Sequence, residues 1–348
     1  MGKWLGDGGK SNLGVTLKDV AREADVNIST ASRALANNYG VHPKTRQKVL
    51  DIARRLNYRP NPAARSLVTG KSRTIGLLIS DIRNLFFAEL ARGAEDAAYA
   101  AGYDIVLCNS DLHPEKQWAY LNSLREKRVA GIVMNTILNL SEAQQTTLAK
   151  YRIPIVLLNR QSSDSPFSTL SADNVAGGEL AASYLIALGH KVIAHFTGPQ
   201  NHGNLSDRCR GFLRVCESAA AQVQAIVLHG DHSYNGGYEM TGKLLSEHRN
   251  VSAIFAGNDM MAFGVLRALS ERGLAVPKDI SLLGFDNVEI SGIINPPLTT
   301  IDQPKYELGR GAVEILLLQA EGNDWVPVHR SFGVRLVERR SCRAIGEE

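Results

Sequence analysis

The sequence of 348 residues lacks the features of an exported, membrane-spanning or disulfide-bonded protein. Its four cysteines show no metal-ligand or redox spacing, which indicates free thiols in a reducing compartment. The N-terminal residues contain no apolar signal core, and no later apolar run is long enough to cross a bilayer. We therefore expect a cytoplasmic protein with no membrane partner.

The sequence also lacks the glycine motifs that bind nucleotide phosphates. It has no GxxxxGK(S/T) loop, and no GxGxxG follows an expected strand. This argues against nucleotide hydrolysis and against a dinucleotide cofactor. Because no His, Asp or Ser group shows catalytic spacing either, we predict no catalytic residue, no metal site and no cofactor.

Charge is distributed unevenly along the chain. Residues 1–73 contain 14 Lys and Arg against 5 Asp and Glu, whereas the remainder contains 25 against 30. A basic head on a mildly acidic body indicates that the head alone binds a polyanion. The length suits two or three domains, and the hydrophobic content of 44% supports sizeable cores.

Residues 16–35 have the pattern of two short helices joined by a tight turn. Thr16 is a good N-cap for the first helix, with Asp19 at its third position. Asn27 is a good N-cap for the second helix. The outer surface of that helix would carry Ile28, Ser29, Thr30, Ser32 and Arg33. Short polar side chains and one arginine at the start of a second helix suit the major groove of DNA.

Two further helical patterns follow. Residues 42–56 predict a third helix, with Pro43 in its first turn and an apolar stripe that completes a small bundle. Residues 61–70 then predict a helix of about two turns, with Asn61 as N-cap and Gly70 past its end. A helix so short is marginal in water, so its formation should depend on a partner surface.

From residue 74 onward, apolar strands alternate with amphipathic helices. Because these apolar runs are continuous, they favour parallel sheets covered by helices on both faces. About nine strand candidates are too many for one such unit, so we expect two lobes of doubly wound α/β structure. The apolar runs are residues 74–79, 103–107, 131–134, 154–158, 192–196, 225–228, 253–255 and 280–284.

The order of these features resembles the LacI/GalR (lactose-repressor/galactose-repressor) family of bacterial transcription regulators, from about Val15 to Arg343. One departure is the turn Asp25-Val26-Asn27, where the family usually has Gly-Val-Ser; Asp tolerates a left-handed backbone, so the turn should survive. The segments that carry the resemblance are residues 16–21, 29–33, 57–61, 64–67, 74–76, 86–89, 208–212, 258–262, 284–287 and 297–301.

The resemblance implies a small all-α helix-turn-helix head and a two-lobed body like the periplasmic sugar-binding proteins, with chain crossovers near residues 173, 302 and 331. The implied divisions are a leader at 1–15, the DNA-binding domain at 16–60, a hinge helix and linker at 61–72, and a ligand-binding domain at 73–343. Its N-lobe would comprise about 73–173 and 304–330, and its C-lobe about 174–301 and 332–343.

The resemblance also implies a homodimer on a near-palindromic operator, with paired hinge helices in the minor groove. Leu67 would wedge into the central base step and kink the DNA. Ile28 and Ser29 should meet base edges, and Arg33 should reach a base or a phosphate. The other head residues in the list that follows should contact phosphates, which set the register. The predicted DNA-binding residues are Thr16, Asn27, Ile28, Ser29, Thr30, Ser32, Arg33, Asn61, Ala64 and Leu67.

A small sugar-like effector would bind in the cleft between the lobes. Asp286 can accept from two hydroxyls and Arg208 can donate a bidentate fork, while Phe86 or Phe87 could stack on a sugar face. Asp173 lies at a crossover and could equally be a hinge or capping residue. The predicted ligand-binding residues are Phe86, Phe87, Asn159, Asp173, His202, Asn204, Arg208, His232, Asn258, Asp286 and Gln303.

We therefore expect a ligand-responsive, sequence-specific transcription regulator, of the repressor type, and not an enzyme. The alternatives are a sugar-binding receptor without a DNA role and an enzyme that acts on a sugar. The absent signal core and the basic head argue against the receptor. Because no long heptad tail follows residue 343, a dimer is expected rather than a tetramer built on a coiled coil.

Overall fold

The computed structural model describes residues 15–36, 39–58, 72–135, 140–151, 153–159, 165–199, 203–219, 223–322 and 326–346. The chain divides into two compact units, residues 1–72 and residues 73–348, and each is described by itself. The predicted hinge helix, with Asn61, Ala64 and Leu67, lies outside the described residues, as does His202. No described helix is long and apolar enough to cross a membrane.

The head contains three helices, α1 (Leu17–Ala24), α2 (Ile28–Leu35) and α3 (Pro43–Arg55), as the sequence predicted. The backbone N–H and the hydroxyl of Thr16 both donate to the Asp19 carboxylate, at 3.0 and 2.6 Å. Asn27 caps α2 by accepting from the N–H of Thr30 at 2.7 Å. Asp25 adopts a left-handed backbone with φ of 54°, which confirms that the turn tolerates aspartate. The bundle closes over buried small residues of α1 and α2 and over Val49 and Ile52 of α3.

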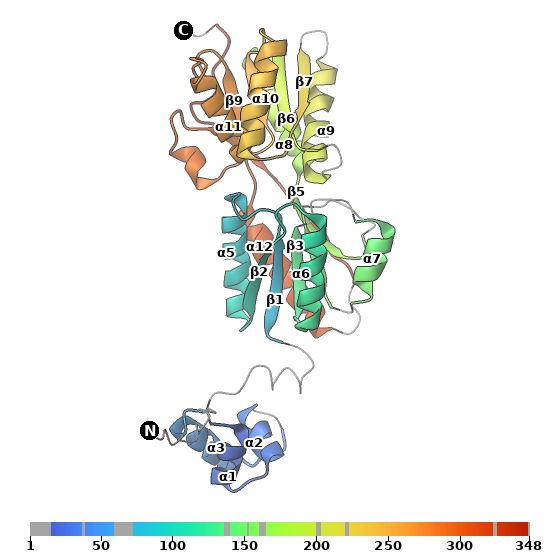
Figure 1. Ribbon diagram of the computed structural model, residues 1–348, viewed down its shortest axis with the longest axis vertical. Coiled ribbons are helices and arrows are strands. Elements are labelled where there is room, and N and C mark those ends of the chain that lie inside the picture. Colours follow the sequence, from blue (N-terminus) through green and yellow to red (C-terminus); the bar gives the residue numbers. More distant parts are fainter. Residues whose placement is uncertain are drawn as a thin grey trace, which may run out of the picture. The chain divides into compact units, whose positions relative to one another are not determined.

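The body consists of two lobes, each with a six-stranded sheet between helices (Figure 1). In the N-lobe the strand order is β11-β5-β4-β3-β1-β2, and every pairing is parallel. Its elements are β1 (Thr74–Ile79), α5 (Phe86–Ala100), β2 (Asp104–Asn109), α6 (Pro114–Glu126), β3 (Gly131–Asn135), α7 (Glu142–Ala149), β4 (Ile155–Leu158), β5 (Ser168–Ala172), α12 (Lys305–Glu321) and β11 (His329–Phe332).

The C-lobe repeats this plan with the order β12-β10-β9-β8-β6-β7, in which only the edge strand β12 is antiparallel. Its elements are α8 (Asn174–Ala187), β6 (Val192–Thr197), α9 (Gly203–Ser218), β7 (Gln224–His229), α10 (Tyr234–Glu247), β8 (Ala253–Ala256), α11 (Asp259–Ser270), β9 (Ser281–Asp286), the 3-10 turn η1 (Glu289–Gly292), β10 (Thr299–Asp302) and β12 (Arg335–Val337).

The chain passes between the lobes three times, after β5, after β10 and after β11. The third passage lies later than the expected residue 331, because Ser331 and Phe332 still pair with β5 in the N-lobe sheet. The first and third passages lie side by side, since the N–H of Asp173 donates to the carbonyl of Phe332 at 2.8 Å.

Three helix pairs pack so closely that their backbones touch. A Cβ placed on Gly93 of α5 would lie 2.1 Å from the carbonyl oxygen of Tyr306 in α12, and one on Gly309 would lie 1.9 Å from that of Leu90. Reciprocal glycines join α8 to α9 and α10 to α11 in the same way. Because the helix backbones touch, the paired helices cannot shift past each other without a clash, so we expect each lobe to move as a rigid unit.

Candidate DNA-reading head and interlobe effector site

The start of α2 presents the residues expected to meet DNA. Ile28 is 45% exposed although it is apolar, and Ser29 and Arg33 are exposed beside it. The Ser29 hydroxyl donates to Asn27 Oδ1 at 2.7 Å, and Arg33 Nε donates to the carbonyl of Ser29 at 3.4 Å. An exposed isoleucine between short polar groups suits a thymine methyl in a major groove, where an arginine can reach a guanine edge.

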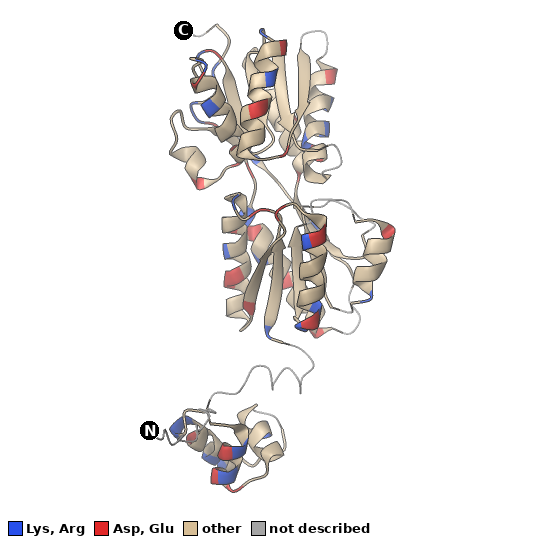
Figure 2. Cartoon of the chain, in the orientation of Figure 1, with Lys and Arg blue, Asp and Glu red and all other residues tan. Residues whose placement is uncertain are grey.

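The charge of the head supports this surface. Helix α3 carries five Lys and Arg residues against the single acidic Asp51, and Figure 2 shows these charges on the described helices. Thr16, the N-cap of α1, and Asn27, the N-cap of α2, are exposed, whereas Thr30 and Ser32 are half-buried. Basic and hydroxyl side chains around a reading helix suit phosphate contacts, which fix the register of a protein on DNA.

The body contains a small cavity between its lobes, of about 30 Å³, which holds roughly two water molecules. The N-lobe contributes side chains from the carboxyl ends of its parallel strands and from the start of α5. The C-lobe contributes residues of α9, the loop before α10 and the end of β9. The lining residues are Ser80, Asn84, Phe86, Phe87, Asn135, Asn159, Asn204, Arg208, His232 and Asp286.

Arg208 and Asp286 form the charged centre of this cavity. The Arg208 guanidinium is 2% exposed, lies 3.6 Å from the centre of the Phe285 ring, and donates from Nε to Asn174 Oδ1 at 2.8 Å. Its Nη2 lies 3.8 Å from Asp286 Oδ1, too far for a direct hydrogen bond. The pair therefore keeps hydrogen-bonding capacity for a third group between the two charges.

Burial dominates the ionisation of this pair. It raises the pKa of Asp286 to about 7, although the Arg208 guanidinium opposes the shift. Burial likewise lowers the pKa of Arg208 to about 10, against the attraction of Asp286. Both shifts show that desolvation outweighs mutual attraction when no ligand lies between the charges.

Two buried side-chain amide oxygens near the cavity accept no hydrogen bond within the described residues. Within the described residues, Asn159 Oδ1 and Gln303 Oε1 have no partner, whereas Gln303 Nε2 donates to Asp286 Oδ1 at 2.6 Å. Asn159 also adopts a left-handed backbone, with φ of 56°. Buried acceptors of this kind are rare in folded proteins, and donor groups of a ligand such as hydroxyls would satisfy them.

Two predicted ligand residues serve the framework of the C-lobe. Asp173 caps α8 by accepting from the N–H of Ala176 at 3.0 Å, and it does not line the cavity. The capping interpretation of Asp173 is therefore the one that the geometry supports. Asn258 is fully buried, caps α11 by accepting from the N–H of Met261, and donates to the carbonyl of His232 at 3.2 Å. It thus supports the loop of a lining residue rather than the cavity itself.

Comparisons with known proteins agree with this architecture. Residues 72–327 match the model for periplasmic binding proteins and the sugar-binding domain of the LacI family, and residues 16–61 match the model for bacterial regulatory proteins of the lacI family. The chain belongs to the LacI family. It is thus a DNA-binding transcription regulator of the repressor type with an effector-binding body, and not an enzyme.

Individual relatives in this family are similar over most of the chain. Catabolite control protein A of Priestia megaterium is 39% identical, over 87% of this chain and 92% of its own. A crystal structure of the Lac repressor dimer bound to operator and the anti-inducer ONPF has a TM-score of 0.83 and 31% identity, over 95% and 99% of the two chains. A LacI-family regulator from Enterococcus faecium with bound ribose has a TM-score of 0.70 and 33% identity, over 78% and 99%.

Sequence reasoning missed three polar lining residues, Ser80, Asn84 and Asn135. Ser80 directly follows β1, and Asn135 ends β3. A polar residue where an apolar parallel strand ends is the signal that could have found both, because ligands bind at the carboxyl ends of such strands. Among the described residues, no group of three or more His, Cys, Asp or Glu could hold a metal ion.

Proposed function

We propose that this LacI-family protein is a cytoplasmic repressor that binds a near-palindromic operator as a homodimer and responds to a neutral monosaccharide in the interlobe cavity. Ile28, Ser29 and Arg33 would select the sequence. Thr16, Asn27, Thr30 and Ser32 would hold the register. The division into a head at 16–60, a hinge at 61–72 and a ligand-binding domain at 73–343 belongs to the same proposal.

The chemistry of the cavity lining is the observation from which we infer the chemical class of the effector. One acidic and one basic side chain lie across from each other, unpartnered amide oxygens flank them, and Phe86 and Phe87 form an edge-to-face pair at 5.1 Å. Hydroxyls both donate and accept, so a polyol can satisfy Asp286, Arg208 and the amides together. Among the described lining residues, Arg208 is the only lysine or arginine, and it already faces Asp286, so a phosphate would have few cationic partners.

A pentose is the first candidate within this class. The E. faecium regulator was solved with bound ribose, and it matches 78% of this chain. The cavity of about 30 Å³ is too small for any sugar, so binding requires the lobes to separate and close again. We expect this movement of the lobes to transmit effector binding to the hinge segment.

The homodimer is supported by an exposed sheet edge in the N-lobe. Strand β2 is the last strand of its sheet, and its consecutive residues Val106 and Leu107 are 38% and 41% exposed. Tyr99, near the end of the adjacent α5, is 79% exposed. Apolar residues on an open edge strand are uncommon in monomers, which usually protect such edges. The Lac repressor neighbour is a dimer, and a second copy is the partner we propose here.

The effector arm of the proposal is tested by thermal shift of the full chain against pentoses, hexoses, sugar phosphates and nucleosides. A neutral sugar should raise the melting temperature, because a ligand that binds the native state stabilises it by mass action. Asp286→Asn should remove the shift, and Glu247→Gln, at the exposed end of α10, should keep it. A shift with sugar phosphates alone would contradict the neutral class.

The DNA arm is tested by fluorescence anisotropy on selected palindromic operators. Arg33→Ala should lose specific binding, since each lost bidentate base contact costs about 1–3 kcal/mol and a dimer loses two. Arg249→Ala, an exposed arginine of the C-lobe, is the matched control. Specific binding by Arg33→Ala equal to that of the parent would refute the assignment. Leu67 in the hinge remains a prediction, and Leu67→Ala in the same assay addresses it.

A further inference from the structure

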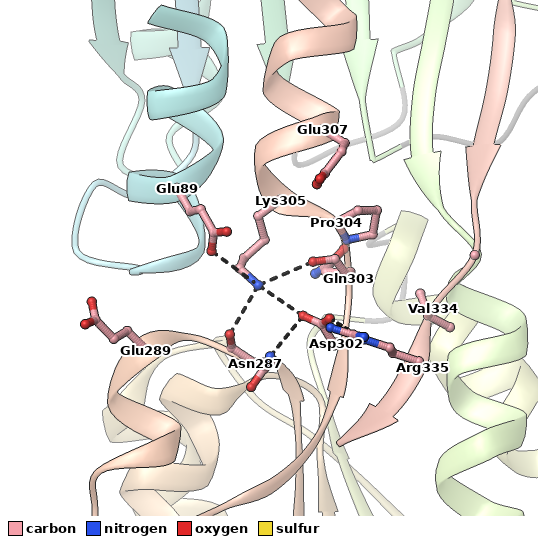
Figure 3. Close-up of a pocket in the computed structure, with 11 residues that line it drawn as sticks. Glu89, Asn287, Glu289, Asp302, Gln303, Pro304, Lys305, Glu307, Val334 and Arg335 are labelled. Carbon is pink, nitrogen blue, oxygen red and sulfur yellow. Dashed lines mark hydrogen bonds and ion pairs between the residues drawn. The ribbon is translucent and has the colours of Figure 1, made fainter. Parts of the chain in front are cut away.

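Lys305 places a buried ammonium group between the lobes. It is the first residue of α12, which packs in the N-lobe, and it is 3% exposed. Its Nζ donates across to the C-lobe, to the carbonyl of Asp286 at 2.8 Å and to that of Asn287 at 3.2 Å. Figure 3 shows the ammonium group at the centre of its contacts with Glu89, Asn287, Gln303 and Asp302, and Asp302 Oδ1 lies 3.4 Å from Nζ.

The two carbonyls that Lys305 binds belong to a strained turn. Asp286 has φ of 114° and Asn287 has φ of 52°, both outside the usual range for residues with a side chain. Such conformations persist only where the surroundings hold them, and they cluster at binding sites. The turn aims the Asp286 carboxyl into the interlobe cavity, where Gln303 Nε2 also meets it. Lys305 therefore holds the turn that carries this carboxyl, and it lines the separate pocket of about 600 Å³ in Figure 3 rather than the small interlobe cavity.

The other side of the ammonium group contacts the N-lobe. Glu89 Oε2 lies 3.4 Å from Nζ, and Glu89 stands on α5 within one turn of Phe86 and Phe87, which line the cavity. The Glu89 side chain is 53% exposed, so this ion pair is the weaker and more easily broken contact. Through Lys305, the cavity-lining segments of both lobes are thus linked behind the cavity.

We propose that Lys305 is a positioning residue that couples effector binding by Asp286 to the relative position of the two lobes. The inference rests on the proposed effector function of the cavity. An effector that engages Asp286 stabilises the turn that Lys305 holds, and Lys305 in turn orients α12 and Glu89 of the N-lobe. Such coupling is reciprocal: the effector changes the affinity for DNA by the same factor by which DNA changes the affinity for the effector. A substitution of Lys305 that weakens the coupling must therefore change the effector affinity of the free protein and that of the DNA-bound protein by different factors.

The test measures two quantities in the full chain: the Kd for the sugar found by thermal shift, and the ratio of operator affinities with and without that sugar. In Lys305→Met we expect sugar binding to weaken by about tenfold and the ratio to move toward one by a similar factor. Lys305→Arg retains donors for both carbonyls and should recover part of both. Lys191→Met, an exposed lysine just before β6 in the C-lobe, should match the parent.

The outcomes separate this inference from the proposed function. If the parent neither binds a sugar nor changes its operator affinity with one, the effector proposal fails. If the parent responds and a folded Lys305→Met shows the same Kd and the same ratio, the Lys305 inference alone is overturned. If Lys305→Met unfolds in circular dichroism, Glu89→Gln decides: a reduced ratio supports the coupling, and a parental ratio shows that Lys305 is only structural.

Discussion

The affinity for a neutral sugar should fall as the pH drops below 7, because Asp286 takes up a proton there. Burial raises the pKa of its carboxyl to about 7. The charged groups that act on it are Arg208 of α9 and Lys305 of α12, which favour ionisation, and Asp259 of α11, which opposes it. A neutral sugar carries no group that titrates in this range, so the protein alone sets the pH dependence.

The magnitude follows from the ionised fraction. Sugar hydroxyls donate more strongly to a carboxylate than to a carboxylic acid, so the ionised form of Asp286 is the binding form. With a pKa of about 7, roughly a tenth of the carboxyls are ionised at pH 6 and nearly all above pH 8. The Kd should therefore be about ten times larger at pH 6 than at pH 8, a difference of about 1.4 kcal/mol.

Isothermal titration calorimetry at pH 6, 7 and 8 measures this dependence. His232 also lines the cavity, so His232→Gln is the control that separates its contribution from that of Asp286. The pH dependence should persist in His232→Gln and disappear in Asp286→Asn. A Kd that is constant from pH 6 to 8, or a dependence that His232→Gln abolishes, would refute the reasoning.

Three other perturbations have calculable effects. Gly93→Ala should lower the free energy of unfolding, measured in urea, by about 3 kcal/mol, because its Cβ meets the backbone of α12. Gly322→Ala should change it by less than about 0.5 kcal/mol, because the nearest atom to its Cβ is the carbonyl oxygen of Leu318 at 3.8 Å, an ordinary van der Waals distance. Burial lowers the pKa of His195 to about 3. Between that pH and about pH 6.5 the imidazole is protonated in the unfolded chain but not in the folded one, so the free energy of unfolding falls as the pH drops through this range. The free energy of unfolding, measured by urea titration at each pH, should therefore fall by about 2 kcal/mol less between pH 7 and pH 5 in His195→Gln than in the parent. Asp25→Gly keeps the left-handed turn and removes a negative charge, so anisotropy should show about threefold tighter operator binding at low salt and less at high salt.

The head could be predicted from sequence because its determinants are local. Asn27 caps the helix that it begins, and Asp25 accepts a backbone angle that depends only on its own side chain. Thr16 and Asp19 satisfy each other across three residues. Contacts at such short separation are present in the pattern itself, so the three helices follow from it.

Four strands of the body, β5, β10, β11 and β12, were not among the predicted apolar runs. Strand β5 is fully buried, yet it reads Ser-Thr-Leu-Ser-Ala, and its Ser168 is satisfied by Gln319, 151 residues away. In β10 the hydroxyl of buried Thr300 donates to Asp259, 41 residues away. Hydroxyls can be buried when a distant partner meets them, and periodicity in one segment cannot reveal that partner.

The cavity could be predicted only in part, again because its residues come from segments that lie far apart in the sequence. Arg208 and Asp286 were found through the family resemblance, and the structure brings them to one centre. Asp173 was placed with them although it caps α8, since a crossover residue and a lining residue look alike in a sequence. The role inferred for Lys305 had no sequence signal, because its partners are backbone carbonyls.

The arrangement of the cores explains why a small ligand can move the lobes. Each large hydrophobic cluster of the described body lies within one lobe, and none spans both. The contacts that Asp286 makes with Gln303 and Lys305 are instead polar. Separation of the lobes therefore divides no hydrophobic cluster, and we expect the balance between open and closed forms to lie within the few kcal/mol that differential binding of a sugar supplies. Because the helix pairs hold each lobe rigid, that free energy acts at the three crossovers rather than within either lobe.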